Sequence, residues 1–486
     1  MATTRLDSST TDGASPGAPA GRSRAAGPAG PGSARARLVL LALLVAVLSG
    51  LLSGTVPAQA TPVSPVDSII TDPGPLPLGY LPLTPDEAGT ACHVKTLDGC
   101  EQAALIVRAI NATPCTGRIT ATFYSMSIDA YADALVAREK CGTDLHILTW
   151  HGLDEDGEVI KDSEQLRRVR SAVKKYGNGW YKSCRYSCYD RRAKGTMHMK
   201  EWLFSSTGDQ QDVIIHSENN ATTNGDLVHF GSLTVLSDPC AYTALSAWID
   251  LGRKDKARTT PKPFSTCDGQ RTFHVAPTKK NAALDLLKAI KEPAPGCRVE
   301  HDMNQVTIDA PTDQVVRLHK AGCQTRAVVD WKLFSQGVLK SASQMKQIRR
   351  LVAAGVPTFD ASWKPTAYNH RKATIAQNGD VRWAASGATN QTKGSFKSAN
   401  ILLVSRVGAD VTAAFAASDV MVAYSHQLTL ESVGCVGAKK KQPAGCTSQH
   451  SSASKRATSS KHLGGSAGSA DPGESFEQRA SELGED

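Results

Sequence analysis

Two cysteine pairs with the same spacing mark this chain as a diverged internal repeat. Cys115 and Cys141 are as far apart in the sequence as Cys297 and Cys323. Each pair brackets a strand pattern and a helix pattern and is followed by a second strand pattern; these lie at 118–123, 128–140, 145–150, 299–308, 311–320 and 325–330. Further helix patterns flank the two units, at 101–110, 163–175, 280–290 and 343–353. Strands alternating with helices are typical of α/β layers, so we predict two α/β halves related by a pseudo-two-fold axis.

Each half also carries a His-x-Lys triplet that is followed, at almost the same distance, by an Asn. The first half reads His198-Met199-Lys200 and later His216-Ser217-Glu218-Asn219, and the second reads His370-Arg371-Lys372 and later Gly387-Ala388-Thr389-Asn390. Alternate residues of a strand share a face, so each His should lie beside its Lys. The apolar strands 213–215 and 381–385 end near the two Asn residues, and a hairpin would return each Asn to the side of its His.

These side chains suit phosphodiester chemistry. Lys and Asn supply charge and directed donors for the two non-bridging oxygens of a phosphodiester. A neutral imidazole can attack phosphorus while a protonated one gives its proton to the leaving oxygen. The chemistry requires no metal and no cofactor, so we expect none. The catalytic candidates are His198, Lys200, Asn219, His370, Lys372 and Asn390.

The paired motifs resemble those of the phospholipase D superfamily, whose signature is H-x-K-x4-D followed by G-S/G-x-N in each half. The resemblance runs from about residue 104 to 424, and Cys184 and Cys188 ahead of the first triplet look like a secreted actinobacterial branch. It implies two α/β/α sandwich halves with the active site at their interface. It also implies that His198 attacks, that His370 protonates the leaving group, and that the Lys and Asn residues hold the phosphate, with Ser217 and Gly387 as further substrate contacts.

The chain departs from that signature at several positions. Ser205 and Gln377 stand where the family has Asp, His216 stands in place of the first Gly, and Ala388 replaces Ser or Gly. We expect the Asp to be a structural support, so that its loss need not abolish activity. No clear acidic residue follows either Asn to orient an imidazole; Asp226 is one candidate and the second half offers only Asn400.

The ends of the chain have a different composition. Residues 1–60 combine a basic lead, an apolar run and a small-residue cleavage pattern, which predicts a secretory signal peptide removed near Ala60. The apolar run is short for a membrane span, and we expect no integral membrane segment in the mature chain. Residues 437–486 are polar and predicted to be disordered. The domains expected between these ends are 61–268 and 269–436, each carrying one triplet.

All 12 cysteines lie outside the predicted leader. An even number in an oxidising compartment indicates disulfides. Pairing nearest neighbours predicts the bridges 92–100, 115–141, 184–188, 240–267, 297–323 and 435–446.

Charge and surface composition give only a mild indication of partners. The formal net charge of +9 falls to +6 without the five Arg and two Asp of residues 1–60, which mildly favours anionic partners. The basic, aromatic stretch 180–192 includes Trp180 and Arg185. One interpretation is a lip of the site that contacts the substrate, either lipid headgroups or an anionic polymer. The other is a disulfide-linked surface loop whose aromatic residues pack on their own scaffold.

We therefore predict a secreted, monomeric, metal-independent phosphodiesterase of phospholipase D type that acts on phospholipid at a membrane surface, with transphosphatidylation as a possible second reaction. Two alternatives stay open. A secreted enzyme acting on nucleic acid would use the same chemistry in a shallow, basic cleft. A catalytically weakened homologue would retain the fold and bind phosphate, which is what the Ser205 and Gln377 replacements would favour.

Overall fold

The computed structural model describes residues 74–83, 97, 100–152, 162–190, 195–222, 230–255, 262–332, 341–361 and 369–435. The predicted signal peptide and polar tail lie outside these residues, as does Asp226. None of the described helices is long and apolar enough to cross a membrane.

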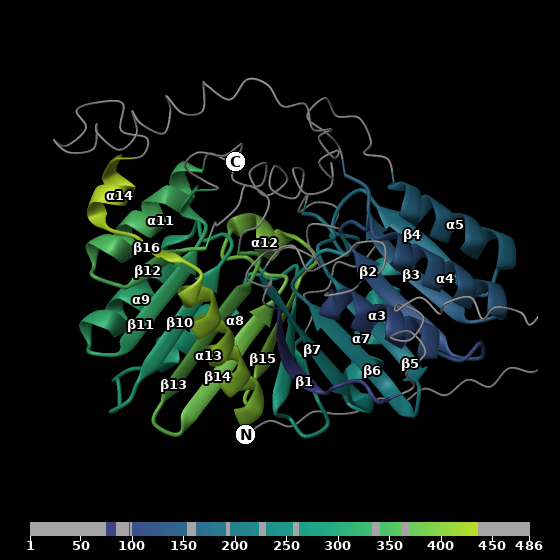
Figure 1. Ribbon diagram of the computed structural model, residues 1–486, viewed down its shortest axis with the longest axis horizontal. Coiled ribbons are helices and arrows are strands. Elements are labelled where there is room, and N and C mark those ends of the chain that lie inside the picture. Colours follow the sequence, from purple (N-terminus) through teal and green to yellow (C-terminus); the bar gives the residue numbers. More distant parts are fainter. Residues whose placement is uncertain are drawn as a thin grey trace, which may run out of the picture. The chain divides into compact units, whose positions relative to one another are not determined.

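The first half is built on a seven-stranded mixed sheet with the order β1-β7-β6-β5-β2-β3-β4 (Figure 1). β2, β3 and β4 run parallel, and the remaining neighbours run antiparallel. The strands are β1 (Gly79–Leu83), β2 (Arg118–Phe123), β3 (Asp144–Trp150), β4 (Trp180–Cys184), β5 (Glu201–Thr207), β6 (Gln210–Ser217) and β7 (Gly231–Ser237).

Helices cover both faces of this sheet. α3 (Glu101–Ala112), α4 (Asp129–Cys141) and α5 (Glu164–Tyr176) pack on one face, where their apolar residues join those of β2, β5, β6 and β7 in one core. α7 (Pro239–Arg253) packs on the other face, in a second core that also contains Phe273, Ile401 and Leu403 of the other half. The two halves therefore share a hydrophobic core, which fixes the site between them.

The second half is built on a nine-stranded sheet with the order β16-β12-β11-β10-β13-β14-β15-β9-β8. The strands are β8 (Phe264–Ser265), β9 (Arg271–Val275), β10 (Arg298–Met303), β11 (Gln324–Val329), β12 (Thr358–Asp360), β13 (Lys372–Asn378), β14 (Val381–Gly387), β15 (Ile401–Ser405) and β16 (His426–Gln427). The helices are α8 (Ala282–Ala289), α9 (Asp309–Lys320), α11 (Ala342–Ala353), α12 (Lys393–Lys397), α13 (Gly408–Ala423) and α14 (Leu430–Cys435). The succession of strands and helices that was predicted from both cysteine units is present in each half.

Local sequence explains where equivalent helices begin. Ser163 caps α5 by accepting a hydrogen bond from the Leu166 amide at 3.1 Å, and Ser341 caps α11 by accepting one from the Gln344 amide at 3.2 Å. Such caps satisfy amides that have no partner within the helix. The caps therefore repeat between the halves along with the helices.

The strand β1 ties the N-terminal part of the described chain to both halves. It pairs with β7 in the first sheet, and its Tyr80 ring packs with Val411 and Phe415 of α13 in the second half. The Tyr80 amide also donates to Asp410 of that helix at 3.3 Å. β1 was not predicted from the sequence, because its pattern is short and contains a proline.

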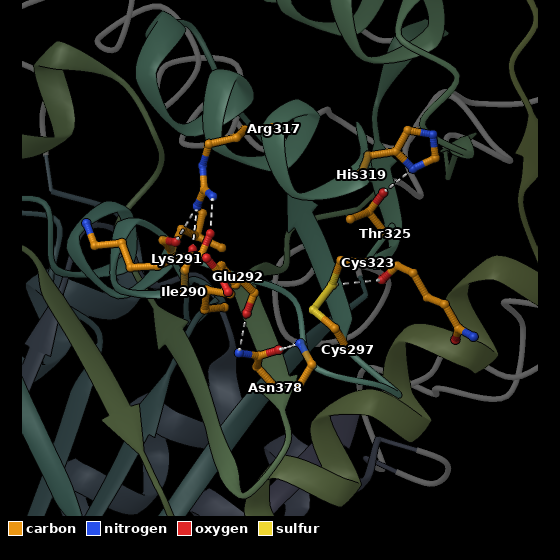
Figure 2. Close-up of a disulfide and its surroundings, with 12 residues drawn as sticks. Ile290, Lys291, Glu292, Cys297, Arg317, His319, Cys323, Thr325 and Asn378 are labelled. Carbon is orange, nitrogen blue, oxygen red and sulfur yellow. Dashed lines mark hydrogen bonds between the residues drawn. A yellow bond between two sulfur atoms is a disulfide. The ribbon is translucent and has the colours of Figure 1, made fainter. Parts of the chain in front are cut away.

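Disulfides join the ends of neighbouring elements, and four predicted bridges are confirmed. These are Cys115–Cys141, Cys184–Cys188, Cys240–Cys267 and Cys297–Cys323. Cys100 is also disulfide-bonded, whereas Cys92 and Cys446 lie outside the described residues. Figure 2 shows the Cys297–Cys323 bridge, which links the start of β10 to the loop after α9, with Cα atoms 4.9 Å apart.

The turn between α8 and β10 is held from two sides next to this bridge (Figure 2). Arg317 donates to the carbonyls of Leu287 and Ile290 at the C-terminal end of α8, at 3.2 and 2.7 Å. Asn378 donates to the Glu292 carbonyl at 3.2 Å and accepts from the Ala294 amide at 2.6 Å. The disulfide therefore lies next to a hydrogen-bonded turn that leads into β10.

Candidate active site between the two halves

The first His-x-Lys triplet lies directly before β5, and the second ends on Lys372, the first residue of β13; each of these strands forms a hairpin with the next. In the first hairpin Glu201 pairs with His216, and in the second Ala373 pairs with Ser386. The hairpins agree with the sequence prediction, but the strands begin after the His residues instead of including them. Each His therefore lies in an extended segment at the end of its sheet.

These extended segments are anchored by the opposite half. The His198 amide donates to the Ala399 carbonyl at 2.8 Å, and the His370 amide donates to the Phe230 carbonyl at 2.9 Å. Isolated bridges join Met197 with Ala399 and Phe230 with Asn369. Because each half holds the backbone of the other half's His, the two imidazoles are brought to a common interface.

The side chains follow the same reciprocal arrangement. His198 Nδ1 lies 2.8 Å from Asn400 Oδ1, and His370 Nδ1 lies 3.1 Å from Asn219 Oδ1. Asn219 thus contacts the His of the opposite half, whereas we had expected the hairpin to return it to His198. Asn400 was considered as a substitute for an acidic partner, and the structure shows that it contacts an imidazole.

Both lysines are almost completely buried, and each lies against the His two residues earlier. Lys200 Nζ donates to the His198 carbonyl at 3.0 Å and lies 3.1 Å from His198 Nε2. Lys372 Nζ donates to the His370 carbonyl at 2.7 Å and lies 3.1 Å from His370 Nδ1. Two buried lysine side chains therefore lie beside the two imidazoles.

Asn219 carries a donor that no described residue satisfies. Its Nδ2 is buried and has no hydrogen-bond partner in the described part of the chain. Its amide group rests against Gly231, where a Cβ atom would come within 2.4 Å of Nδ2. Because unpaired buried donors are costly, Asn219 Nδ2 is a candidate donor for a bound acceptor.

The remaining motif residues are buried. Asn390 Oδ1 accepts from the Gln305 amide at 3.2 Å. Ser217 is buried, and its Oγ accepts from Gln102 Nε2 at 3.0 Å and from the Asn219 amide at 3.1 Å. Ser217 therefore positions Asn219. Gly387 has φ of +144°, and a Cβ atom there would come within 2.4 Å of the Ile401 carbonyl, so only glycine fits.

A buried ion pair occupies the position where the family motif has its first Gly. His216 Nδ1 lies 2.7 Å from Glu201 Oε1, and His216 Nε2 lies 3.3 Å from the Ser386 carbonyl of the other half. Burial lowers the pKa of His216, but the Glu201 carboxylate outweighs burial and the pKa is raised. Glu218, whose pKa is raised by burial, accepts from the Gly387 amide at 3.3 Å. His216 and Glu218 thus join the two motif segments across the interface.

Aromatic rings border the first triplet. Tyr124, at the end of β2, packs edge-on against His198 with centroids 5.2 Å apart, and Lys200 Nζ lies 5.6 Å from the Tyr124 centroid. Trp150, at the end of β3, stacks on Tyr124 at 4.8 Å. The sequence analysis did not single out these two rings. The relevant signal was an aromatic residue at the carboxyl end of each of two neighbouring parallel strands.

Arg371, the central residue of the second triplet, points away from the site into a buried polar network. It donates to Asp302 Oδ2 at 2.6 Å, to the Ala414 carbonyl at 2.8 Å and to the Tyr80 hydroxyl at 3.0 Å. Because Tyr80 belongs to β1 and Asp302 to β10, this network ties both halves to the segment that carries His370.

Four other candidate positions lie elsewhere. The Ser205 hydroxyl accepts from the Arg118 amide at 2.8 Å, and Gln377 pairs with Arg298, so both motif positions connect neighbouring strands. Trp180 begins β4, pairs with His146 and stacks on its ring, at the end of the strand far from the triplet. Arg185 is exposed just past the other end of β4, where its guanidinium lies 5.5 Å from the Tyr186 ring.

No protein-family model and no curated protein matches this chain, but solved structures match its fold. Phosphatidylserine synthase of Haemophilus influenzae Rd KW20 is 12% identical with a TM-score of 0.50, over 72% of this chain and 89% of that one. Polyphosphate kinase of Porphyromonas gingivalis is 14% identical with a TM-score of 0.44 over 70% of this chain, which spans only 46% of the kinase. The phospholipase D family member Nuc of Salmonella typhimurium is 15% identical with a TM-score of 0.27, over 33% of this chain and 99% of that one.

At these identities the likeness concerns the fold alone. The match to the synthase covers most of both chains. The two sheets with their flanking helices are the two α/β halves that were predicted. The phospholipase D-like fold of two α/β halves, which the paired motifs implied, is therefore confirmed.

Proposed function

We propose that this protein is a secreted, metal-independent phosphodiesterase of phospholipase D type, which hydrolyses a phospholipid to phosphatidic acid and the free headgroup alcohol. The observation that carries the proposal is the reciprocal pairing of His198 with Asn400 and of His370 with Asn219. Each pair joins an imidazole of one half to an amide of the other half. One substrate phosphate between the halves would therefore meet both imidazoles.

In the first step His198 acts as the nucleophile. The Nε2 lone pair forms a bond to phosphorus while the bond from phosphorus to the headgroup oxygen breaks. The imidazolium of His370 gives its proton to that oxygen, so the headgroup leaves as a neutral hydroxyl. The products are a phosphohistidine on His198 and a neutral His370.

In the second step His370 acts as a base. It takes a proton from water while the water oxygen bonds to phosphorus, and the bond to Nε2 breaks with its electron pair returning to His198. An alcohol in place of water would give transphosphatidylation. Together the two steps restore the starting state of the site, with His198 neutral and His370 protonated.

Lys200, Lys372, Asn219 and Asn390 hold the non-bridging oxygens in this scheme. Both ammonium groups are at most 2% exposed, so their charge acts with little screening by water. The unpartnered Nδ2 of Asn219 supplies a fixed donor. Because these groups provide the positive charge at the phosphate, the reaction needs no metal.

Secretion is supported by the disulfides, which persist in oxidising compartments.

The test is release of choline and phosphatidic acid from phosphatidylcholine vesicles in the presence of a chelator. We expect wild type and the control His319→Ala, which alters a half-buried histidine of α9, to release both products. His198→Ala should release neither and form no phosphoenzyme. His370→Ala should accumulate phosphohistidine, detected by mass spectrometry, with a substrate whose leaving group is p-nitrophenol.

Three results would overturn parts of this proposal. Wild-type turnover in both His198→Ala and His370→Ala would exclude the mechanism. Chelator-resistant cleavage of DNA with no cleavage of phosphatidylcholine would replace the lipid substrate with nucleic acid. Binding of tungstate, a phosphate analogue, without turnover of any diester would leave a phosphate-binding homologue.

A further inference from the structure

Asn400 and Gly231 occupy equivalent places at the interface of the two halves. The His198 amide donates to the carbonyl of the residue just before Asn400, at 2.8 Å. The His370 amide donates to the carbonyl of the residue just before Gly231, at 2.9 Å. Each place therefore lies beside the His segment of the opposite half, but only the first of the two carries a side chain.

The Asn219 amide fills the place that a side chain at Gly231 would take. Its Nδ2, Oδ1 and Cγ atoms lie 2.4, 2.5 and 2.6 Å from where a Cβ atom of residue 231 would be. Its Oδ1 is 3.1 Å from His370 Nδ1. Asn400 Oδ1 makes the corresponding contact with His198 Nδ1, at 2.8 Å. An amide oxygen thus faces Nδ1 of both imidazoles, although it comes from different positions in the two halves.

The backbone of Gly231 does not itself require glycine. Gly231 begins β7, pairs with Leu83 of β1, and is not among the glycines with positive φ. Other residues adopt such an extended conformation without strain. The three atoms nearest to a Cβ atom at this position all belong to Asn219, which is 2% exposed and whose amide nitrogen donates to Ser217 Oγ at 3.1 Å. The missing side chain at 231 therefore matches the position of the Asn219 side chain.

Lys372 competes with Asn219 for the same nitrogen of His370. Its Nζ lies 3.1 Å from His370 Nδ1. An ammonium can only donate, so it favours a neutral ring with the proton on Nε2. The amide oxygen of Asn219 can only accept, so it favours the proton on Nδ1 and the lone pair on Nε2. The second step of the proposed mechanism uses the latter tautomer, because Nε2 needs its lone pair to take a proton from water.

We propose that Asn219 and Gly231 are positioning residues for His370. The missing side chain at 231 admits the Asn219 amide, and this amide holds the proton on His370 Nδ1 against the ammonium of Lys372. Gly231 thus acts on the imidazole through Asn219. The inference rests on the proposed function and gives Asn219 a task there besides contact with the phosphate.

The first test reads the tautomer and needs no turnover. The ring nitrogens of the full-length protein, carrying isotope-labelled histidine, are observed by NMR at about pH 9, where an ordinary histidine is neutral. The signals of His370 are assigned by comparison with His370→Gln. We expect the proton on Nδ1 in wild type and on Nε2 in Asn219→Ala and Gly231→Ala. Asn400→Ala, the control, should leave the His370 tautomer unchanged.

Two results of this test would overturn the proposal. One is a proton on Nε2 of His370 in the wild-type protein. The other is a proton that stays on Nδ1 in Asn219→Ala, because the amide would then not be the group that holds it there.

The second test is a double-mutant cycle on kcat with phosphatidylcholine. Asn219→Ala and Gly231→Ala should each lower kcat by about ten- to a hundredfold, as expected for loss of a hydrogen bond to a charged group. The double variant should be no slower than Asn219→Ala alone, because the added Cβ atom then displaces no amide. Losses that multiply in the double variant would show that Gly231→Ala does not act through Asn219.

The third test moves the amide from one position to the other. Gly231→Asn combined with Asn219→Ala places an amide where the other half has Asn400. This variant should return the proton to His370 Nδ1 and raise kcat by about tenfold over Asn219→Ala. Gly231→Ala combined with Asn219→Ala should do neither. The same tautomer and the same kcat in both double variants would contradict the proposal.

These results separate the positioning role from the catalytic proposal. The expected tautomers in a protein that hydrolyses no diester would support the positioning role and contradict the proposed activity. Hydrolysis by a wild-type protein whose His370 carries its proton on Nε2 would contradict the positioning role and leave the activity standing.

Discussion

His198 Nδ1 lies 2.8 Å from Asn400 Oδ1, so the proposed nucleophile is oriented by an amide instead of a carboxylate. The orientation of that amide is fixed because Asn400 Nδ2 donates to the Ser395 carbonyl at 2.7 Å. Only Oδ1 can then face the imidazole, and it must accept a hydrogen bond from Nδ1–H. A neutral His198 therefore carries its lone pair on Nε2, the atom that would attack phosphorus.

Asn400→Asp should change the pH dependence of the reaction. A carboxylate in contact with the ring stabilises the imidazolium over the neutral imidazole. The Lys200 ammonium and the Tyr124 ring, which face the same imidazole, remain in both proteins. Because the nucleophile must be neutral, the acid limb of kcat/KM should move to higher pH.

The control for this prediction is Asn400→Ala. It removes the acceptor without adding charge, so it should lower kcat through loss of orientation and leave the acid limb near its wild-type position. An acid limb that is the same in wild type and in Asn400→Asp would show that His198 is not the group that must lose a proton.

Glu201→Gln should destabilise the protein in a pH-dependent manner. The pKa of His216 is raised above 6.5 in the folded protein, so the stabilisation that comes from His216 is complete below about pH 6.5 and is lost as pH rises through the raised pKa. Burial also raises the pKa of Glu201, which weakens the pair at more acidic pH, so the comparison starts at pH 6. Removal of one partner from a buried pair costs about 3 kcal/mol. Chemical denaturation should show that deficit at pH 6 and a smaller one at pH 9, and a deficit that grows with pH would refute the assignment.

Restoring the family's Asp should have little effect on catalysis. Ser205 lies five residues beyond Lys200 on an extended strand, about 16 Å away, and its hydroxyl accepts from the Arg118 amide. Ser205→Asp and Gln377→Asp should therefore keep kcat within about threefold of wild type, and Ser205→Ala should cost about 1 kcal/mol of stability. A hundredfold change in kcat in any of these variants would place the position in the chemistry.

The sequence allowed the elements and the disulfides to be predicted, because both depend on local pattern and spacing. β2 was predicted with its observed bounds, and the bridges 115–141 and 297–323 followed from pairing each cysteine with its nearest neighbour. The cross-half contacts were not predictable in this way. Asn219 could be expected near an imidazole, but which His it contacts depends on how the two halves pack.

The same limit explains the unexpected position of Trp180. Its sequence neighbourhood is aromatic and basic, which suggested a lip of the site, yet β4 is parallel to β2 and β3, and Trp180 is its first residue. The carboxyl ends of these strands lie near the triplet, as Tyr124 and Trp150 show. Strand direction therefore separates Trp180 from Arg185 by the length of β4.

His301 should make the protein less stable as the pH falls. Burial lowers the pKa of His301 to about 4 from a usual 6.5, because the ring is enclosed in the second sheet with Thr374 as its hydrogen-bond partner. Between these values the unfolded chain binds a proton that the folded chain excludes, so stability falls with pH, by about 3 kcal/mol for this residue. The free energy of unfolding of His301→Phe should lack this component, so the difference between variant and wild type should shift in the variant's favour from pH 7 to pH 4. NMR titration of the His301 ring should show it neutral at pH 5, and a ring already protonated at that pH would contradict the prediction.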